Sequence, residues 1–286
     1  MLGLLRVVHP FPSLLDGIVV LVVALVAGGE PAVAVRLGLS MTLIQFAIGA
    51  LNDLVDAPRD AGRKAGKPIP AGLVTAATAH GLIVGCAALG LALAALSGAA
   101  VFALALAGFG IGVAYDLRAK GTVMSWAPLA LGIPLLPVYG WFGAVGTLPS
   151  VFLALVPIAA LEGGALAIAN SLVDVERDRE AGSESVATHL GPASASIVLV
   201  VGQLLVGLLA TGTASAEGAP PGWLSAVVLA AGVPVVGAVA SLASIHRPPA
   251  WREVAWEIQA VGAGVLAVAW LGSLGAAGGL GIAGGL

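Results

Sequence analysis

Long apolar stretches separated by short polar connections dominate the 286-residue chain. Nine stretches approach the roughly 20 residues that an α-helix needs to cross a bilayer. They cover 13–29, 33–51, 73–96, 98–114, 124–143, 150–169, 192–213, 223–245 and 254–274. None alternates apolar and polar residues as the strands of a membrane β-barrel do. The pattern predicts an all-α polytopic membrane protein built as a nine-transmembrane-helix bundle.

Composition strengthens this prediction and excludes other classes of protein. The chain is 59% hydrophobic and 9% charged, whereas soluble domains carry about a quarter charged residues. Lipid must therefore be the solvent for most of the chain. A net charge of −3 with scattered basic residues provides no stripe for nucleic acid. The single cysteine, Cys86, lies in an apolar run, where we expect it to pack within a helix.

The basic residues predict the orientation of the bundle. With nine spans, 11 of the 12 Lys and Arg residues fall in the N-terminal segment and the even-numbered connections, and only Arg36 lies on the other side. The positive-inside rule therefore places the N-terminus and the loops near 52–72, 115–123 and 170–191 in the cytoplasm, for a protein of the cell's inner or plasma membrane. Most charged side chains gather in these loops, so we expect an active-site cavity that faces the cytoplasm.

Two of these loops contain related sequences. The segments 52–60 and 170–178 are identical at six of nine positions, at an offset of 118 residues. An internal repeat predicts two related halves, approximately 1–123 and 124–286, within a single domain that covers 1–286. Each copy follows an apolar stretch, so we expect each at the cytoplasmic end of a helix.

Polar side chains recur every four residues in both copies, which at helical pitch puts them on one face about 6 Å apart per step. The series are Asn52, Asp56 and Asp60, then Asn170, Asp174 and Asp178. Pro58 predicts either a break or a separate short helix in part of the first copy, because proline interrupts the hydrogen bonding of a helix.

Stacked carboxylates indicate a bound cation. Two such charges 4 Å apart repel by about 4 kcal/mol at an effective dielectric constant of roughly 20. Two acidic clusters that face each other therefore predict a divalent-cation site, and oxygen ligands favour Mg²⁺ or Ca²⁺ over zinc. Neighbouring basic residues would contact the phosphates that Mg²⁺ usually shares: Arg59, Arg63, Lys64, Lys67, Lys120, Arg177 and Arg179. The alternative is that the acidic runs are salt-bridged interfacial caps.

These features lead to a hypothesis about chemistry. Two Asp-rich helix ends hold Mg²⁺, the metal and basic residues hold a diphosphate, and its apolar chain lies in the bundle. Ionisation of the carbon–oxygen bond would leave an allylic cation beside a neutralised diphosphate.

The motifs resemble those of a known family. They are Asn52-Asp53-x-x-Asp56-x-x-x-Asp60, the sequence Lys-Pro-Ile-Pro-Ala-Gly at 67–72, the segment 115–121, Asp174-x-x-x-Asp178 and His189-Leu190-Gly191. Over nearly the whole chain this pattern is similar to the UbiA superfamily of intramembrane prenyltransferases.

The resemblance implies roles for individual residues. The implied Mg²⁺ ligands are Asn52, Asp53, Asp56, Asp60, Asp174 and Asp178, and the implied prenyl diphosphate contacts are Asn52, Arg63, Lys67, Lys120, Asn170 and Arg177. Catalytic roles fall to Asp56, Asp60, Asp174, Asp178 and Tyr115. An aromatic ring at Tyr115 would steady the cation, and the alternative for Tyr115 is a place in the interfacial aromatic belt.

Some positions depart from the family pattern or leave a choice open. Ser171 replaces the aspartate of the first copy, which predicts a poorer second metal site, and Lys120 follows Tyr115 by five residues where four are usual. Glu162 lies inside a predicted span, facing either the cavity or a neighbouring helix. His9 is either interfacial or close to the acceptor.

The predicted reaction is transfer of a prenyl group to a small lipophilic acceptor within the membrane, and we expect an aromatic, quinone-precursor-like acceptor. One alternative is a membrane terpene cyclase, which the low aromatic content of 5% disfavours because cyclases line their cavities with aromatic walls. Another is a non-enzymatic lipid transporter. Carriers place polar residues at the bilayer midplane, whereas here they gather at one face.

Overall fold

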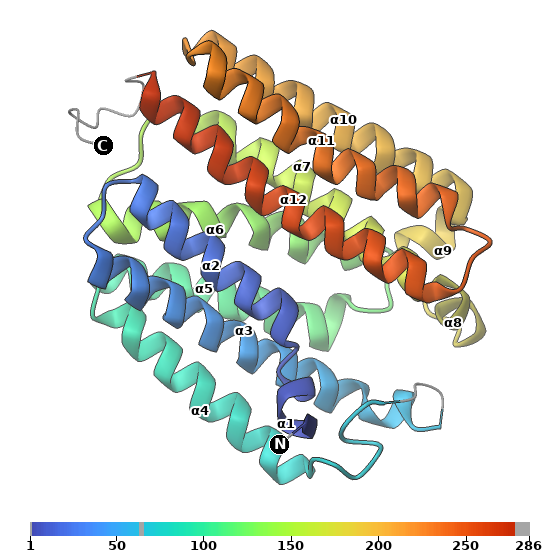
Figure 1. Cartoon of the computed structure of the whole chain (residues 1–286). Coiled ribbons are helices and arrows are strands. Elements are labelled where there is room, and N and C mark those ends of the chain that lie inside the picture. The colour runs from blue at the N-terminus through green and yellow to red at the C-terminus, as the bar shows by residue number, and fades with distance from the viewer. Residues whose placement is uncertain (1, 63–65, 278–286) are drawn as a thin grey trace. The chain divides into compact units, whose positions relative to one another are not determined.

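The computed structural model describes residues 2–62 and 66–277 (Figure 1). Within these ranges the ordered elements are all helices, and there is no β-strand. Eight of the helices in this part of the chain are long and apolar enough to cross a membrane. The all-α membrane class predicted from the hydrophobic pattern is confirmed.

The chain forms two compact units. The first comprises Met1–Arg118 and Tyr139–Gly146. Its elements are α1 (Leu2–Val7), α2 (Pro10–Val26), α3 (Pro31–Asp60), α4 (Ala76–Ala95), α5 (Ala99–Ala114) and most of a π-helical turn, η1 (Tyr115–Ala119).

The second unit comprises Ala119–Val138 and Thr147–Leu286. Its elements are the 3₁₀ turn η2 (Val123–Trp126), most of α6 (Ala127–Val145), α7 (Phe152–Val173), α8 (Val175–Glu180), α9 (Val186–Leu190), α10 (Pro192–Ala216), α11 (Pro221–Ala243) and α12 (Pro249–Ala276). Helix α6 contains Pro134 and Pro137, and the division between the units falls directly after them, between residues 138 and 139.

Proline and helix length explain how the spans begin and which of them can cross the bilayer. Five long helices have a proline in their first turn, where the missing N–H costs nothing: Pro10, Pro31, Pro192, Pro221 and Pro249.

Helix α2 has 17 residues, about 26 Å at 1.5 Å per residue, which is short of a hydrocarbon core of about 30 Å. A total of nine spans, the predicted orientation and the predicted cavity stay predictions.

Small residues bring the helices of the first unit close together. The Ser40 hydroxyl on α3 donates to the Gly90 carbonyl on α4 over 2.7 Å, and the Tyr139 hydroxyl donates to Ser40 Oγ over 2.8 Å. A Cβ at Gly90 would lie 2.9 Å from the Ile44 side chain. Glycine therefore permits the contact between α3 and α4, as small residues do in membrane helix pairs.

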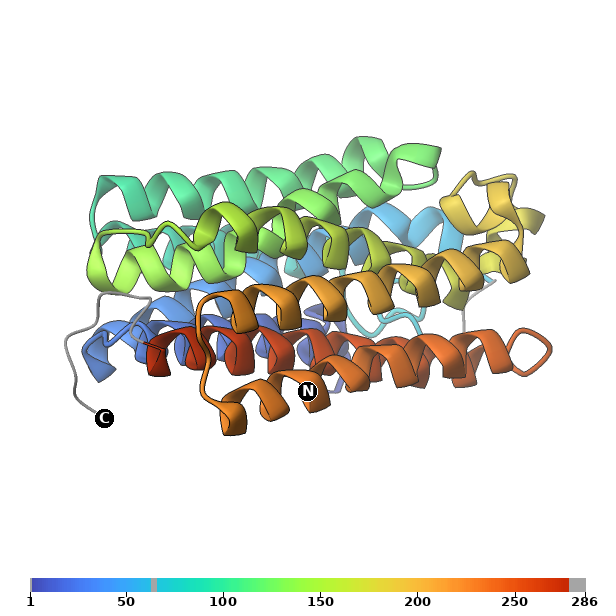
Figure 2. The same cartoon turned by 90° about the horizontal axis from the view of Figure 1, so that it is seen from above.

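The same principle holds in the second unit, where α11 and α12 run side by side (Figure 2). A Cβ at Gly237 of α11 would come within 2.8 Å of the Ala255 carbonyl on α12. In the other direction, a Cβ at Gly262 of α12 would lie 2.8 Å from the Pro234 nitrogen. These glycines allow the backbones of the two helices to approach closely.

Candidate active site

The first acidic motif occupies the last turns of α3, which continues without a break to Asp60. Asn52, Asp56 and Asp60 therefore share one helix face, and the predicted position at a helix end is confirmed. The break predicted at Pro58 is wrong. Proline at this position removes only the bond to the carbonyl of residue 54, and the helix ends two residues later, so little is lost.

A buried carboxylate anchors this motif. Asp53 is 2% exposed, and its Oδ1 accepts from His9 Nε2 over 2.9 Å and forms an ion pair with Lys67 Nζ. Lys67 also lies 3.7 Å from Asp60 Oδ2. Asp53 thereby ties the segment before α2 and the segment after α3 to one point on the helix, and its remaining oxygen is buried. This geometry does not favour the predicted role of Asp53 as a direct metal ligand.

His9 reaches Asp53 because of an unusual backbone turn. It connects α1 to α2 with φ of 48°, the positive φ of the left-handed region, where non-glycine residues are uncommon. The structure places His9 beside the first motif, and a role near the acceptor stays a prediction. A histidine 44 residues away in the chain carries no sequence signal for this contact.

A second contact joins α3 to the π-helical turn η1 of the same unit. The Asn52 side-chain amide donates to Asp116 Oδ1 over 2.7 Å, and Asp116 is 4% exposed. Because the nitrogen is used in this bond, the amide oxygen is the atom left for a cation. Sequence reasoning missed Asp116, whose only signal was its place directly after Tyr115.

Tyr115 begins the π-helical turn η1, which continues to Ala119 and is followed by Lys120. A π turn holds one residue more than an α turn, and such turns recur at functional sites. The extra residue accounts for the five-residue spacing between Tyr115 and Lys120. The proposed roles of both side chains stay predictions.

The second motif is bent. Helix α7 ends at Val173, Asp174 has φ of −106° and ψ of 10°, and α8 begins at Val175. Asn170 is thus on α7, whereas Asp178 is on α8, and the prediction of one continuous helical face through the second copy is wrong. Valine on both sides of Asp174 disfavours helix, and Val175 is fully buried against Leu172 and Ala187, which draws the chain off the α7 axis.

The charges of the second motif are paired differently from those of the first. Asp174 forms an ion pair with Arg177, three residues on. Ser171, at the position equivalent to Asp53, donates to the Ile168 carbonyl of its own helix over 2.9 Å. The second motif therefore has its cation supplied locally by α8, whereas the first receives Lys67 from a following loop.

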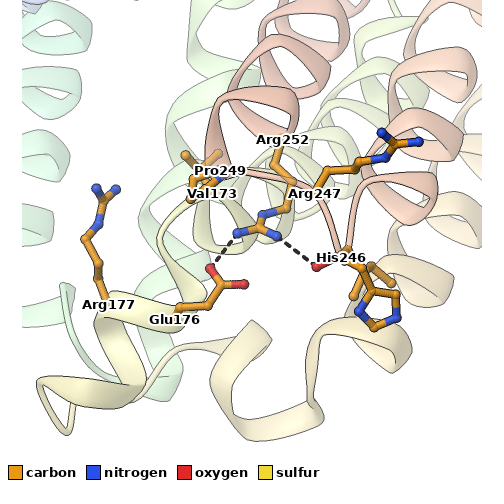
Figure 3. Close-up of a pocket in the computed structure, with 8 residues that line it drawn as sticks. Val173, Glu176, Arg177, His246, Arg247, Pro249 and Arg252 are labelled. Carbon is orange, nitrogen blue, oxygen red and sulfur yellow. Dashed lines mark hydrogen bonds and ion pairs between the residues drawn. The ribbon is translucent and has the colours of Figure 1, made fainter.

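An ion pair between a buried arginine and an exposed glutamate fixes α8 and was not predicted from the sequence. Arg252, at the start of α12, is 1% exposed, and it donates to Glu176 Oε2 and, over 3.2 Å, to the Ile245 carbonyl (Figure 3). The pair links α8 to the loop between α11 and α12. The sequence offered only a basic residue next to a predicted span, which reads as an orientation signal.

Glu162 faces a neighbouring helix, the second of the two alternatives that the sequence left open. It is 5% exposed on α7, and the Gln203 side-chain amide on α10 donates to its Oε1 over 3.1 Å. This bond joins two membrane helices of the second unit.

The structure leaves the joint metal site a prediction. Across residues 2–62 and 66–277, no three His, Cys, Asp or Glu side chains come together as a ready metal cage. The two motifs belong to different compact units, and Arg63 and Lys64 lie outside the described residues. Mg²⁺ is commonly held by one or two protein carboxylates together with substrate phosphates, so a complete protein cage is not required.

Comparison with known proteins identifies the family. The sequence profile of the UbiA prenyltransferase family matches residues 17–256. The chain belongs to this family. As a UbiA family member it is an intramembrane prenyltransferase, which decides against the non-enzymatic transporter considered from the sequence.

Individual UbiA relatives agree with this assignment. The digeranylgeranylglyceryl phosphate synthase of Methanopyrus kandleri is 29% identical over 210 residues, covering 72% of this chain and 76% of its own. The synthase of the same name from Methanoregula boonei is 26% identical over 203 residues, covering 68% and 71%. A structure of a UbiA homologue from Archaeoglobus fulgidus bound to GPP and Mg²⁺ superposes with a TM-score of 0.69 at 21% identity, covering 93% and 99%, and shows the shared fold.

Proposed function

We propose that this UbiA family member uses Mg²⁺ to transfer a prenyl group from a prenyl diphosphate to the hydroxyl of a phosphorylated glycerol lipid in the membrane. The observation that carries the donor half is the first motif, in which carboxylates at the end of α3 lie beside a lysine that Asp53 holds in place. The UbiA homologue of known structure with GPP and Mg²⁺ supports the same donor chemistry.

The residues present fit Mg²⁺. Asp60 and Asp174 are 19% and 33% exposed, so both carboxylates are within reach of a solvated ion. With Asn52, Asp56 and Asp178, they supply the oxygen donors that Mg²⁺ prefers. When bound, the metal supplies the positive charge that stabilises a departing diphosphate. We assign Asp53 to positioning Lys67, since its Oδ1 is already shared by His9 and Lys67 and its Oδ2 is buried.

The chain's own cations complete the donor site. Lys67 is held close to Asp60, which supports a role for its ammonium in binding the diphosphate of a metal-bound donor. Arg177, paired with Asp174, serves the second motif in the same way. Arg63, Lys120 and Asn170 remain further candidates for diphosphate contact, and Tyr115 remains the candidate for steadying the allylic cation.

The acceptor is the point on which the sequence and the relatives differ. The sequence led us to expect an aromatic acceptor. No feature of the described residues favours an aromatic acceptor over another class of acceptor. Both relatives described above carry the name digeranylgeranylglyceryl phosphate synthase, which describes a product with two prenyl chains and a phosphate on glycerol. A glycerol phosphate that already bears one geranylgeranyl chain is therefore the acceptor we favour.

The reaction that follows from this choice is an ether synthesis. The bond between the prenyl carbon and the diphosphate oxygen breaks, the acceptor hydroxyl oxygen bonds to that carbon, its proton is released, and diphosphate leaves. The apolar helices keep water away from the allylic cation, which would otherwise be hydrolysed.

Product analysis of the purified protein in lipid nanodiscs tests the proposal. Labelled geranylgeranyl diphosphate and Mg²⁺ are supplied with geranylgeranylglyceryl phosphate, with a hydroxybenzoate or naphthoate, or with no acceptor. We expect a digeranylgeranyl ether in the first incubation alone. If product forms only with the aromatic acceptor, the proposed glycerol lipid acceptor is wrong but the protein is still a transferase. If a cyclic hydrocarbon forms without any acceptor, the protein is a cyclase.

A further inference from the structure

An open hollow of about 300 Å³ lies within the second unit, and none of the residues assigned to the first motif lines it. The end of α7, helix α8 and the loop between α11 and α12 form its walls (Figure 3). Its polar lining consists of Glu176, Arg177, His246, Arg247 and Arg252. Such a density of basic groups stands out in a chain that has only 12 Lys and Arg residues in all.

The charges in this pocket do not cancel. The lining contains three guanidinium groups and one carboxylate, that of Glu176, which pairs with Arg252. Arg177 shares its charge with Asp174. Arg247 is exposed, and its side chain has no partner among the described residues. Arg177 and Arg247 flank the central Arg252 on opposite sides (Figure 3).

Arg252 gives an independent sign that a ligand belongs here. Its side chain is 1% exposed, and two of its nitrogens are satisfied by Glu176 and the Ile245 carbonyl. The third nitrogen, Nε, is buried without a hydrogen-bond partner among the described residues. A buried donor left unpaired on a charged group is costly, so an acceptor oxygen supplied by a ligand is the expected remedy.

The position of the pocket relates it to the membrane surface. It lies where α11 ends and α12 begins, at the end of two membrane helices. Trp251, next to Arg252, is 61% exposed, and exposed tryptophan at a helix end is typical of the membrane–water interface. A lipid headgroup is therefore within reach.

We propose that this pocket binds the phosphate monoester of a lipid, with Arg247 and Arg252 as its main contacts. A phosphate monoester carries a charge of about −1.5 to −2 and three acceptor oxygens, which suits several guanidinium groups better than a single carboxylate would. The lipid is either the prenyl acceptor or an anionic lipid of the bilayer. The acceptor case rests on the proposed function.

For the acceptor, the pocket provides orientation. Arg177 both lines the pocket and pairs with Asp174, so a phosphate bound here is anchored beside the second motif. Held by its phosphate, the acceptor would present its hydroxyl at a defined distance from that motif, which lowers the entropic barrier to transfer.

The test compares three variants with the wild type in nanodiscs. Arg247→Gln removes an exposed cation and should not affect folding. Arg252→Lys keeps the charge but loses the planar fork and Nε. Arg6→Gln, an exposed arginine on α1 in the first unit, is the matched control for loss of one positive charge. For the acceptor, we expect KM to rise about 10-fold in the two pocket variants, with KM for geranylgeranyl diphosphate unchanged.

A second arm needs no turnover and identifies the lipid. Thermal stability of each protein is measured without donor or Mg²⁺, in nanodiscs of phosphatidylcholine with and without about 20% phosphatidic acid, because a lipid that binds the folded protein raises its melting temperature. Stabilisation that is lost in Arg247→Gln, without a change in acceptor KM, identifies a bilayer lipid. If Arg247→Gln loses the stabilisation and also has a raised KM for the acceptor, the lipid bound in the pocket is the acceptor.

Failure of the inference is distinct from failure of the proposed function. If the wild type uses no phosphorylated acceptor, the function is wrong, and the phosphatidic acid arm still decides the pocket. If Arg247→Gln matches Arg6→Gln in both arms, the pocket binds no phosphate, and the inference is overturned whatever Arg252→Lys does.

Discussion

Replacing Asp53 by asparagine separates positioning from metal binding in the first motif. The change keeps the size of the side chain and removes its charge, so His9 and Lys67 lose their shared anionic partner. If Asp53 acts through Lys67, the variant should bind the donor poorly while its requirement for Mg²⁺ stays the same.

The loss of stability and the rise in donor KM expected for Asp53→Asn depend on the ion pair with Asp60 that Lys67 retains. Breaking a buried ion pair costs about 3–5 kcal/mol when a charge is left uncompensated. Lys67 retains Asp60 at 3.7 Å, an attraction of about 4 kcal/mol at an effective dielectric constant of roughly 20. We therefore expect a loss of stability of only about 2 kcal/mol. A displaced charge-assisted contact to phosphate is worth about 1.5–3 kcal/mol, which corresponds to a rise of roughly 10- to 100-fold in KM for the donor.

The assay is diphosphate release as a function of donor and Mg²⁺ concentration, in a double-mutant cycle with Lys67→Gln. Two residues that act as a unit are not additive. The Asp53→Asn, Lys67→Gln double variant should therefore show about the same donor KM as Lys67→Gln alone. His9→Gln, which leaves the ion pair in place, serves as the control and should stay within a few-fold of the wild type.

Two results would refute this reasoning. Multiplicative effects of Asp53→Asn and Lys67→Gln would show that the two residues act independently. A rise in the Mg²⁺ concentration needed for half-maximal activity, with donor KM unchanged at saturating metal, would make Asp53 a metal ligand after all.

Two further predictions concern the second unit. Gly163→Ala should lower the melting temperature and cost about 1–3 kcal/mol of stability, because its Cβ would lie 2.3 Å from the Leu129 carbonyl. Gly164→Ala is the matched control, since the space around Gly164 is open. Equal stability of the two variants would contradict the close packing of Gly163 against Leu129. Glu162→Gln should retain stability and turnover, because its amide oxygen still accepts from Gln203. Glu162→Leu should lower the melting temperature, because it removes this hydrogen bond between two membrane helices. A Glu162→Gln variant that folds but is inactive would indicate that Glu162 takes part in the reaction.

The helical spans were predictable because lipid leaves the backbone few alternatives. The ends of the spans were less so. Helix α3 runs to Asp60, nine residues past the stretch that ends at residue 51, because the motif's polar side chains lower the hydrophobicity while its backbone stays helical. Hydrophobicity reports the solvent around a segment, and a helix that leaves the membrane keeps its hydrogen bonds in water.

The breaks in the helices depend on tertiary packing, and local rules placed them wrongly. Pro58 is tolerated because the helix ends within the same turn. Asp174, in a segment that repeats the first motif, marks a bend, because Val175 is buried in the core of its unit and Arg252 holds Glu176. Two segments that are identical at six of nine positions therefore adopt different backbones.

The partners of the motif residues show the same limit. The candidate carboxylates could be identified from their spacing of four, which is a local property. His9 and Asp53 are 44 residues apart, and Glu176 and Arg252 are 76 apart. Contacts of this kind follow no period along the chain, so the sequence revealed which residues carry charge and not which charges meet.

The most direct test of the account is diphosphate release by Asp56→Asn and Asp174→Asn across a range of Mg²⁺ concentrations. Each substitution keeps the shape of the side chain and removes one carboxylate that we propose as a Mg²⁺ ligand, one from each motif. We expect a fall in kcat of at least about 100-fold in each, on the scale of losing one preorganised electrostatic contact, with partial recovery at high Mg²⁺. Turnover equal to the wild type in both variants would contradict a shared metal-dependent site.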